Sequence, residues 1–335
     1  MNWKNKTVLV TGGTGSFGKA FIRILLEEHQ PEKVIVFSRD ELKQHEMRAA
    51  GFDQPNLRYF IGDVRDLPRL QRAMYGVDVV VHAAALKQVP ACEYNPLEAI
   101  KTNILGTANV VEAALENEVE KVLALSTDKA VSPVNLYGAT KLAAEKLTVQ
   151  SNAYSGERRT RFACVRYGNV VGSRGSVVPV FLRQRENGKL TITDERMTRF
   201  WLSLEQGVRF VMQCIAVMQG GEVFVPKLPS TTLIDLAKVM APEAELDIIG
   251  IRPGEKLHEV LISEDEARTA RELEDMYVIQ PAQGPGFVYA WAEKGTSLPD
   301  GYRYSSLDNE QVLSHQEITA LVAPIEADWK AGKLA

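Results

Sequence analysis

The chain has 335 residues, of which 45% are hydrophobic and 24% charged, a composition typical of soluble globular proteins. This length allows either one large core or two unequal domains. The formal net charge of −4 is small and negative, so the charge balance gives no reason to expect a nucleic acid partner.

Cysteine and histidine give no indication of a metal site. Cys92, Cys164 and Cys214 fit no ligand spacing, so we interpret them as buried thiols in a reducing compartment. The five histidines form no H-x-x-H or similar pair. We find no signal-peptide core near the start and no window of ~18–20 unbroken apolar residues, the length that a membrane span needs. We therefore expect a cytoplasmic protein without a metal or a membrane partner.

Residues 7–38 predict a strand, a glycine turn, a helix and a second strand. The β-rich run TVLV is followed by TGGTGSFG at residues 11–18, and a helical period begins at Lys19. The turn has glycine at 12, 15 and 18, which lets the backbone approach a pyrophosphate seated on the amides of the helix N-terminus. Its position between a strand and a helix is the context that supports a dinucleotide site.

The end of the second strand bears on the choice between NADP and NAD. The strand ends in Ser38 and Arg39, and not in the carboxylate with which NAD enzymes bind the ribose 2′-hydroxyl. Arg39, with Lys43 following, can pair with a 2′-phosphate. Asp40 could still fold back to the ribose, so NAD stays open, but the sequence favours NADP.

Strand and helix patterns alternate through the next ninety residues. Strands are predicted at 57–61, 77–81 and 122–125, and Asn103 is expected to open a helix over 104–115. Repeated units of this kind predict an α/β fold of the Rossmann type, with a doubly wound parallel sheet and ligands at the carboxyl ends of its strands.

Two of these strand ends carry further candidates for cofactor contacts. Asp63, followed by Val64, comes after the strand at 57–61, where its carboxylate can meet the adenine amine. Ala83 and Ala84 follow the strand at 77–81, and their side chains are small enough for a cofactor to lie against the backbone.

A candidate catalytic set follows the strand at 122–125. If the chain is helical from Leu136 onward, Tyr137 and Lys141 lie four residues apart on one face. An unperturbed tyrosine titrates near ~10, so a tyrosine base at neutral pH needs a positive charge beside its phenolate, and Lys141 can supply one and lower the phenol pKa. The cluster STDK at 126–129 ends the strand and reaches the same sheet edge.

Several motifs together resemble a known family. HAAALK at 82–87, Asn103 and YGATK at 137–141, with the glycine turn, resemble the extended short-chain dehydrogenases/reductases. More narrowly, the chain resembles the inverting UDP-N-acetylglucosamine 4,6-dehydratases, the first enzymes of pseudaminic acid synthesis. The motifs are TGGTGSFGK, SRDELKQ, STDKAVSPVNLYGATK, RYGNVVGSRGSVVP and RPGEKLHE. The resemblance covers about residues 5–280, and the tail at 286–335 carries little of it.

The resemblance implies a lyase that removes water across C5 and C6 of the sugar of UDP-N-acetylglucosamine. Tyr137 would take the C4 hydroxyl proton while hydride passes to NADP, Thr127 would bind the same oxygen, and Lys141 would hold the phenolate and the nicotinamide ribose. Asp128 would be the C6 acid and Lys129 the C5 base. Return of hydride to C6 and of a proton to the other face of C5 would give a UDP-4-keto-6-deoxy-L-hexosamine.

Lys129 is the residue that distinguishes this branch, because similar retaining dehydratases have glutamate there. A base must be neutral part of the time, whereas a model lysine titrates near ~10.4. Burial and Lys141 would lower the pKa of Lys129, and Asp128 would raise it. The sequence does not give the balance.

The contact residues expected for cofactor and substrate come from the turn, the strand ends and the resemblance. The cofactor contacts are Gly12, Thr14, Gly15, Ser16, Phe17, Gly18, Ser38, Arg39, Lys43, Asp63, Val64, Ala83, Ala84, Lys87, Tyr137 and Lys141. The substrate contacts are Lys87, Asn169, Val177, Arg199, Arg252 and Glu255. In addition, the loop at 172–177, with Arg174, can present amides and a guanidinium to a diphosphate.

We expect two lobes that are interleaved in sequence. Residues 1–166 and about 203–226 would form the NADP-binding Rossmann domain. About 167–202 and 227–335 would form a smaller α/β substrate-binding lobe, in which 263–273 has the pattern of a charged helix. Relatives form dimers or hexamers, so a homo-oligomer is expected.

Two other functions remain open. A UDP-sugar 4-epimerase needs Tyr137, Thr127 and the cofactor, but has no use for an acid-base pair such as Asp128 and Lys129. A non-catalytic dinucleotide sensor would have lost Tyr137 and Lys141. A related five-inverting dehydratase of capsule synthesis lacks the tyrosine in the relatives that resemble this chain, so Tyr137 disfavours it.

Overall fold

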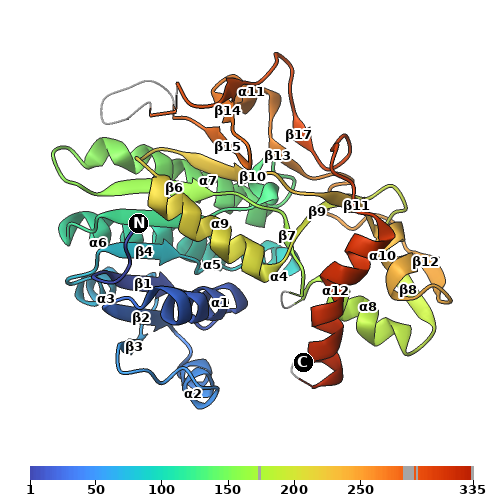
Figure 1. The fold of residues 1–335 in the computed structure, drawn as a ribbon, viewed down its shortest axis with the longest axis horizontal. Helices are drawn as coiled ribbons and strands as arrows, with labels where there is room; N and C mark the ends of the chain where they lie inside the picture. Colours follow the sequence, from blue (N-terminus) through green and yellow to red (C-terminus); the bar gives the residue numbers. More distant parts are fainter. Residues whose placement is uncertain (173–174, 282–289, 292, 333–335) are drawn as a thin grey trace.

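We describe the fold from a computed structural model, in which residues 1–172, 175–281, 290–291 and 293–332 are described. The predicted fold class is confirmed: the chain is an α/β protein built on a large, mainly parallel sheet with helices on both faces (Figure 1). Among the described residues, no helix combines the length and apolar character required to cross a membrane.

The parallel part of the sheet sets the position of the ligand crevice. Its strands are β1 (Thr7–Thr11), β2 (Lys33–Ser38), β3 (Leu57–Ile61), β4 (Val79–His82), β5 (Lys121–Leu125), β6 (Arg161–Val165) and β10 (Val223–Pro226). Their order in the sheet is β3-β2-β1-β4-β5-β6-β10. The chain reverses its direction of travel across the sheet between β1 and β4, and ligands of doubly wound folds bind at the carboxyl ends of strands at such a point.

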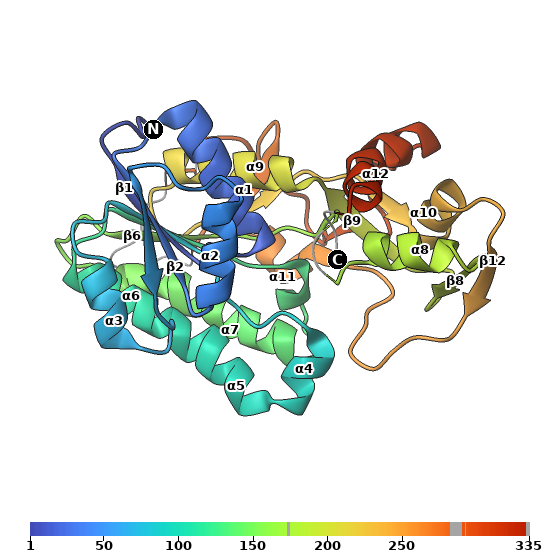
Figure 2. The same cartoon turned by 90° about the horizontal axis from the view of Figure 1, so that it is seen from below.

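The strands are buried because helices cover both faces of the sheet (Figure 2). One face carries α1 (Ser16–Ile24) and α9 (Leu204–Val217). The other carries α3 (Leu67–Ala73), α6 (Gly106–Glu116) and α7 (Leu136–Gln150). All five residues of β1 are buried, as expected for a parallel strand covered on both sides.

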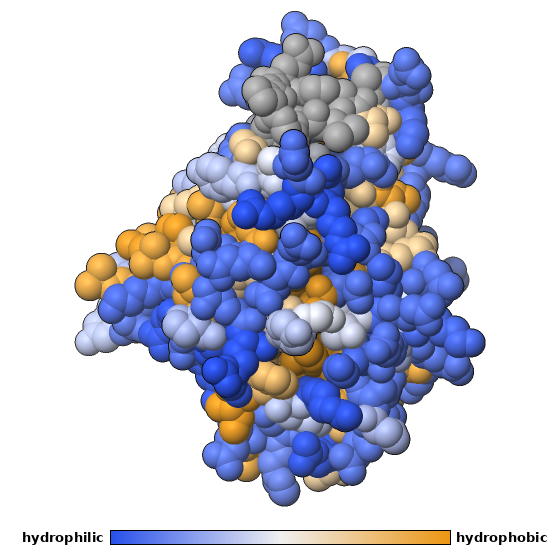
Figure 3. Space-filling view, turned by 90° about the vertical axis from the view of Figure 1, so that its left-hand side faces the viewer, coloured by the Kyte–Doolittle hydropathy of each residue, from blue (hydrophilic) through white to orange (hydrophobic). Residues whose placement is uncertain are grey.

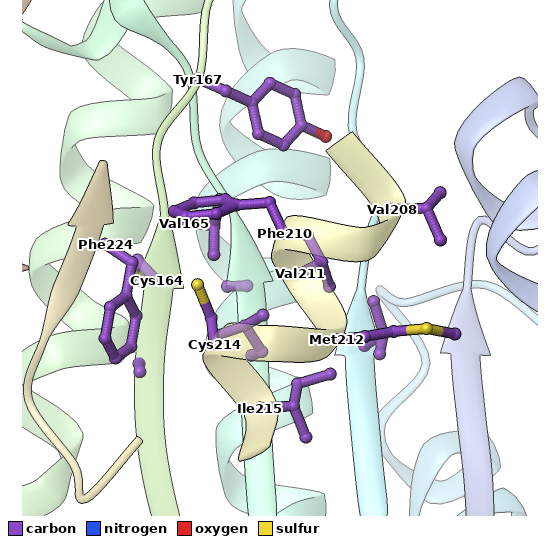
Figure 4. Packing of buried hydrophobic residues seen from close by; sticks show 14 of the residues in the cluster. Cys164, Val165, Tyr167, Val208, Phe210, Val211, Met212, Cys214, Ile215 and Phe224 are labelled. Atoms are coloured by element: carbon purple, nitrogen blue, oxygen red, sulfur yellow. The ribbon is translucent and has the colours of Figure 1, made fainter. Parts of the chain in front are cut away.

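Helix α9, from a later part of the chain, packs against one face of the large sheet. Its residues Val211, Cys214 and Ile215 belong to the same buried cluster as Val165 of β6 and Phe224 of β10 (Figure 4). The helix begins with a capping box, in which the side chains and backbone amides of the residues at 203 and 206 bond reciprocally. Residues 203–226, which the sequence assigned to the NADP-binding domain, thus supply a helix that packs on the large sheet and a strand within it.

The far edge of the sheet is antiparallel. It consists of β15 (Met276–Ile279), β14 (Ala270–Glu272) and β16 (Thr296–Ser297). The charged helix predicted over 263–273 is wrong, because only α11 (Glu264–Ala267) is helical and Arg271 pairs with Val278 of β15. Strand pairing at the edge of the sheet thus overrides the local helical pattern. These three strands lie in a range that the sequence assigned to the second lobe, and the division into two lobes stays a prediction.

A second, smaller group of elements packs around its own core on the right of Figure 1. It contains α8 (Val177–Arg185), β8 (Lys189–Ile192), α10 (Leu233–Met240), β12 (Glu245–Ile248) and α12 (His315–Lys330). Short strands lie between this group and the large sheet, namely β7 (Asn169–Val170), β9 (Thr198–Leu202), β11 (Ser230–Thr232), β13 (Val260–Ile262) and β17 (Tyr304–Ser305). Helix α12 gives the tail of the chain a packing role, since Ile318 and Val322 are buried in this core.

Asn103 does not open a helix, contrary to the sequence prediction. Helix α5 (Pro96–Ile100) runs through a π-helical turn at Lys101–Leu105 directly into α6, so Asn103 lies inside a continuous helix. Its buried amide bonds both backbone groups of Leu86 and the hydroxyl of Thr140. Asn103 therefore fixes the chain after β4 instead of capping a helix.

The remaining helices are short or continue longer ones. They are α2 (Glu41–Ala49), α4 (Val89–Tyr94), the π-helical Leu25–His29 that continues α1, and 3-10 turns at Asp128–Ala130 and Ser151–Tyr154. The face of the molecule at the left of Figure 1 is mainly hydrophilic, with groups of hydrophobic residues between the hydrophilic ones (Figure 3).

Arg166, directly after β6, is fully buried between two carboxylates. Its guanidinium donates to Glu145 on α7 (Nε to Oε2, 3.1 Å), to Glu266 on α11 (Nη2 to Oε1, 2.8 Å) and to the carbonyl oxygen of Leu261 (2.8 Å). Burial raises the pKa of Glu266, but Arg166 more than offsets this and lowers it to about 2. Each charge is therefore tolerated in the interior only because its partners are present.

Replacing Arg166 by methionine should leave the Glu145 carboxylate buried without a counterion, and Glu266 with only Lys146, whose amine lies 3.9 Å away. We expect Arg166→Met to lower the free energy of unfolding by about 3–5 kcal/mol near neutral pH, measured by urea denaturation. Arg209→Met, which breaks an exposed ion pair with Glu28, is the control and should have a smaller effect. Equal losses in the two variants would contradict this interpretation.

His82, the last residue of β4, is buried as a neutral ring. Its Nδ1 lies 2.7 Å from the Thr11 hydroxyl, and its Nε2 lies 3.0 Å from the Thr107 hydroxyl. Thr107 donates to the Asn103 carbonyl, so it accepts from Nε2, and Thr11 donates to Nδ1. Burial, with a smaller effect from the positive charge of Lys141, lowers the pKa of His82 to about 3.

The depressed pKa of His82 makes stability depend on pH with a defined sign. An unfolded histidine titrates near ~6.5, so between about pH 6.5 and 3 only the unfolded chain binds this proton. We expect His82 to remove up to ~1.4 kcal/mol of stability per unit of pH decrease in this window, and nothing above it. His82→Gln should flatten the slope of urea stability between about pH 6 and 5, whereas His45→Gln, at an exposed site, should leave it unchanged.

Candidate active site

A pocket of about 700 Å³ opens at the carboxyl ends of the parallel strands, the size of a small-molecule or cofactor site. All sixteen predicted cofactor contacts and all five predicted catalytic residues line it. Five residues of the lining also have a buried polar side-chain atom without a hydrogen-bond partner among the described residues. They are Thr102, Ser126, Asp128, Asn169 and Ser176. Buried polar atoms are usually paired, so this concentration indicates a ligand that supplies the partners.

The glycine turn after β1 is shaped for close approach of a ligand. Gly12 has φ +67°, which favours glycine, and a Cβ there would lie 3.0 Å from the backbone of Ala84 at the end of β4. A Cβ on Gly18 would lie 2.5 Å from Gly13, so α1 packs closely against the turn. The amides at the start of α1 therefore face the pocket between β1 and β4, which is the arrangement that binds a pyrophosphate.

The end of β2 presents hydroxyl and cationic groups to the same pocket. The hydroxyls of Ser38 and Thr14 lie 3.0 Å apart. Arg39 is exposed, with its guanidinium 3.6 Å from Asp63. Asp40 is the N-cap of α2 and accepts from the Lys43 amide, and the Lys43 amine lies 2.9 Å from the same carboxylate. Asp40 lines the pocket as well, but its carboxylate is engaged in capping α2 and in the contact with Lys43.

The catalytic candidates are brought together by a 3-10 turn after β5 and by the start of α7. Asn135 caps α7 by accepting from the Gly138 amide (2.7 Å), which fixes the helix start one residue before Tyr137. A Cβ on Gly138 would collide with the carbonyl oxygen of Lys129. Glycine at this position thus allows α7 to lie directly against the turn, and Tyr137 faces the same pocket as the turn.

Lys129 lies between two carboxylates. Its amine is 3.0 Å from Asp128 Oδ1 and 3.3 Å from Glu259 Oε1. Burial lowers the pKa of Lys129, but Asp128 and Glu259 outweigh it and raise that pKa above the ordinary value. The Lys129 side chain also lines the pocket and is 28% exposed. In the absence of substrate, Lys129 is therefore an ammonium held at the pocket wall.

Glu259 was missed from the sequence. It is 2% exposed and follows the motif residues of 252–256 by only three positions, so the RPGEKLHE run contains it. The sequence could not show that Glu259 pairs with Lys129, because Lys129 lies 130 positions earlier in the chain and no local pattern links the two.

The helix spacing brings Lys141 to the same pocket as Tyr137, where its amine also has a backbone partner. Its amine donates to the Leu125 carbonyl oxygen at 2.6 Å, and burial lowers the pKa of Lys141. Burial raises the pKa of Tyr137 to about 12, and the positive charge that most opposes this shift belongs to Lys129. A side-chain hydrogen bond between Tyr137 and Thr127 also lowers the Tyr137 pKa. The spacing of four residues thus places Tyr137 and Lys141 in one pocket, and the effect of Lys141 on the Tyr137 phenolate stays a prediction.

The predicted substrate contacts separate into two groups. Lys87 and Asn169 line the pocket. Val177 begins α8 one residue after Ser176, which lines it, whereas Arg252 is exposed and Glu255 half-buried in the loop before β13. Ser173 and Arg174 lie outside the described residues.

Arg199 does not reach the pocket. Its guanidinium is buried and donates to the carbonyl oxygens of Thr198 (2.7 Å), Leu257 (2.9 Å) and Lys256 (3.0 Å). The structure therefore places Arg199 as a brace for the segment at 256–259. No cluster of three or more His, Cys, Asp or Glu side chains that could hold a metal ion occurs in the described part of the chain.

The chain is similar to proteins that are named as enzymes of nucleotide sugars. The UDP-N-acetylglucosamine 4,6-dehydratase (inverting) of Campylobacter jejuni is 53% identical over 328 residues, which are 96% of this chain and 98% of that protein. The UDP-glucose 4-epimerase of Rickettsia canadensis is 43% identical over 330 residues, 95% of each chain. The X-ray structure of Pen from Bacillus thuringiensis has a TM-score of 0.88 at 40% identity and covers 97% of this chain and 99% of that one.

A family model places the chain directly. The model described as polysaccharide biosynthesis protein matches residues 8–281. This range includes the glycine turn, the 3-10 turn Asp128–Ala130 (the catalytic turn), α7 and Glu259. The chain therefore belongs to this family of polysaccharide biosynthesis proteins, on an extended short-chain dehydrogenase/reductase fold.

Proposed function

We propose that the chain is a UDP-N-acetylglucosamine 4,6-dehydratase, a hydro-lyase that inverts C5. The observation that carries this proposal is the contact between Lys129 and Asp128 in the pocket that also holds Tyr137, Thr127 and the glycine turn. An acid and a base beside a tyrosine are what elimination across C5 and C6 requires. The inverting dehydratase of Campylobacter jejuni supports the substrate and the stereochemistry.

The pocket fits a nicotinamide dinucleotide, and we infer NADP. The amides of the glycine turn would hold the pyrophosphate, and Thr14, Ser38, Arg39 and Lys43 would surround the 2′-phosphate. Asp40, the carboxylate that could have favoured NAD, is used to cap α2. When bound, NADP supplies the hydride acceptor for C4 of the sugar and the hydride donor for C6.

Tyr137 is the base for the first proton. Its phenolate would remove the C4 hydroxyl proton while Thr127 bonds the same oxygen. Because burial raises the pKa of Tyr137, the phenolate needs positive charge, which Lys129 supplies in the structure. The resulting C4 ketone makes the neighbouring C5 proton acidic, and this prepares the elimination.

One proton transfer can give Asp128 and Lys129 the protonation states that their roles need. Burial raises the pKa of Asp128, and Asp128 Oδ2 has no hydrogen-bond partner among the described residues. If the proton of Lys129 moves along its 3.0 Å contact to Asp128, the ion pair becomes a neutral acid beside a neutral amine. Lys129 then takes the C5 proton, and Asp128 protonates the C6 hydroxyl that leaves as water.

Three wider parts of the proposal rest on the family resemblance. The product, a UDP-4-keto-6-deoxy-L-hexosamine, would enter pseudaminic acid synthesis, whose glycan target, flagellin or another, we leave open. We also propose a cytoplasmic homo-oligomer, a dimer or a hexamer. Substrate contacts by Val177, Arg252 and Glu255 complete the proposal.

The second candidate is a UDP-sugar 4-epimerase. The Rickettsia relative, named UDP-glucose 4-epimerase, favours it, and Tyr137 and Thr127 would serve that reaction equally well. A 4-epimerase has no step for the buried pair of Asp128 and Lys129, so we rank it second.

We expect the purified protein to convert UDP-N-acetylglucosamine into the 4-keto-6-deoxy sugar, identified by NMR. Lys129→Met should lower the rate of dehydration about 100- to 10,000-fold, because the C5 base is lost. Lys189→Met removes an exposed lysine and is the matched control, expected to keep full activity. A C4 epimer as product would establish the epimerase, and full activity of Lys129→Met would exclude the proposed base.

We expect Arg39→Ala to weaken NADP binding about 10- to 100-fold, the range for loss of a charge-assisted hydrogen bond. NAD binding should change less than about twofold, since NAD lacks the 2′-phosphate. Nucleotide-quenched protein fluorescence would give both dissociation constants. Arg48→Ala, at the other end of α2, is the control. Equal weakening of NADP and NAD binding would mean that Arg39 does not bind the 2′-phosphate.

A further inference from the structure

The Glu259 carboxylate contacts three cations beside the catalytic turn. Its Oε1 lies 3.3 Å from the Lys129 amine and 3.9 Å from Arg199 Nε. Its Oε2 lies 3.3 Å from the Lys256 amine. These cations come from the catalytic turn, from β9 and from the loop before β13. Glu259 is therefore the point where the segments of β9 and β13 meet the catalytic turn.

The backbone holds Glu259 rigidly. Its amide donates to Ser306 Oγ at 2.9 Å, and the Ser306 amide donates to the Glu259 carbonyl oxygen at 2.9 Å. Lys256 fixes the same region from the other side, because its amine donates to the Val131 carbonyl oxygen (2.8 Å) just after the catalytic turn. The carboxylate thus has a defined position relative to Lys129.

The balance of charge shows what Glu259 contributes. Lys129, Lys256 and Arg199 share two carboxylates, Asp128 and Glu259. Without Glu259, three cations would share one carboxylate. Arg199 and Lys256 are held by backbone carbonyl oxygens, and their side chains are 10% and 13% exposed. Lys129 is 28% exposed toward the pocket, so it is the side chain that repulsion would displace.

We propose that Glu259 is a positioning residue, which holds the Lys129 amine within reach of Asp128 and at the pocket wall. This inference rests on the proposed function for its effect on turnover, but the arrangement of charges is independent of the substrate. Removal of Glu259 should let Lys129 move away from the place where it meets C5 of the sugar. Misplacement of a catalytic group by about 1 Å can cost about 100-fold in rate.

The test without turnover uses Glu259→Gln, which keeps the shape and removes the charge. The charged or titratable groups around the Lys129 amine are Asp128, Arg199, Glu259, Tyr137 and, across Glu259, Lys256. Loss of the Glu259 charge should lower the Lys129 pKa, so that reductive methylation of Lys129, followed by peptide mass spectrometry, begins at a pH lower by about one unit or more. An unchanged pH profile would overturn the proposal.

The test with turnover separates positioning from binding. In Glu259→Gln, kcat for UDP-N-acetylglucosamine should fall about 100-fold while KM and NADP affinity stay within about twofold. Glu259→Asp restores the charge on a shorter side chain and should recover the methylation profile and part of kcat. Glu222→Gln alters a fully buried carboxylate that bonds the amides of Gln219 and Gly220, and should change neither readout.

The two arms distinguish failure of this inference from failure of the proposed function. If the wild-type protein makes no 4-keto-6-deoxy sugar but Glu259→Gln still shifts the methylation profile, the function is wrong and the positioning holds. If the wild-type protein dehydrates the substrate and Glu259→Gln keeps both its kcat and its methylation profile, Glu259 has no positioning role.

Discussion

The buried guanidinium of Arg166 joins the parts of the molecule that form the active site. It ties the end of β6 to Glu145 on α7 and to Glu266 on α11. Glu145 lies four residues after Lys141, so the two side chains share one face of α7. The ion cluster therefore fixes the rotation of the helix whose first turns carry Tyr137 and Lys141. No apolar contact would define that rotation as strictly, because an ion pair at zero exposure must keep its geometry.

Close approach is the second constraint at the site. Gly138 allows α7 to rest on the carbonyl oxygen of Lys129, which places Tyr137 beside the catalytic turn. Lys129 is then the cation that lowers the pKa of Tyr137 most, and its amine also contacts Asp128 and Glu259. Oxidation at C4 would use the charged form of Lys129 and elimination at C5 and C6 its neutral form, so both steps would depend on one side chain. This coupling suits a reaction in which one sugar stays bound through several proton transfers.

Much of this arrangement could be predicted from local sequence. The glycine turn, the strand ends and the pair Tyr137 and Lys141 follow from short-range spacing, and the structure places all of them around one pocket. The errors have long-range causes. Residues 270–272 form a strand because β15 offers them a partner, and Asn103 lies within a helix because α5 continues through a π-helical turn.

Electrostatics was the least predictable part of the site. The sequence could not show whether burial or the carboxylates would decide the Lys129 pKa, because Glu259 comes from a distant segment. The backbone partners of the Arg199 guanidinium were equally hidden, because the carbonyl oxygens of Leu257 and Lys256 come from a distant segment. The Lys129 pKa and the partners of the Arg199 guanidinium both depend on distances between segments that are far apart in the chain. These distances cannot be derived from the sequence without the fold.

The placement of Glu259 has a consequence for how the enzyme is made. The strands of the dinucleotide half, from β1 to β6, are all present once residue 165 has left the ribosome, and that half can begin to collapse around its own cores. The second carboxylate that pairs with Lys129, that of Glu259, is synthesised about ninety residues later. The arrangement of charges around Lys129 is therefore complete only after most of the chain has been made.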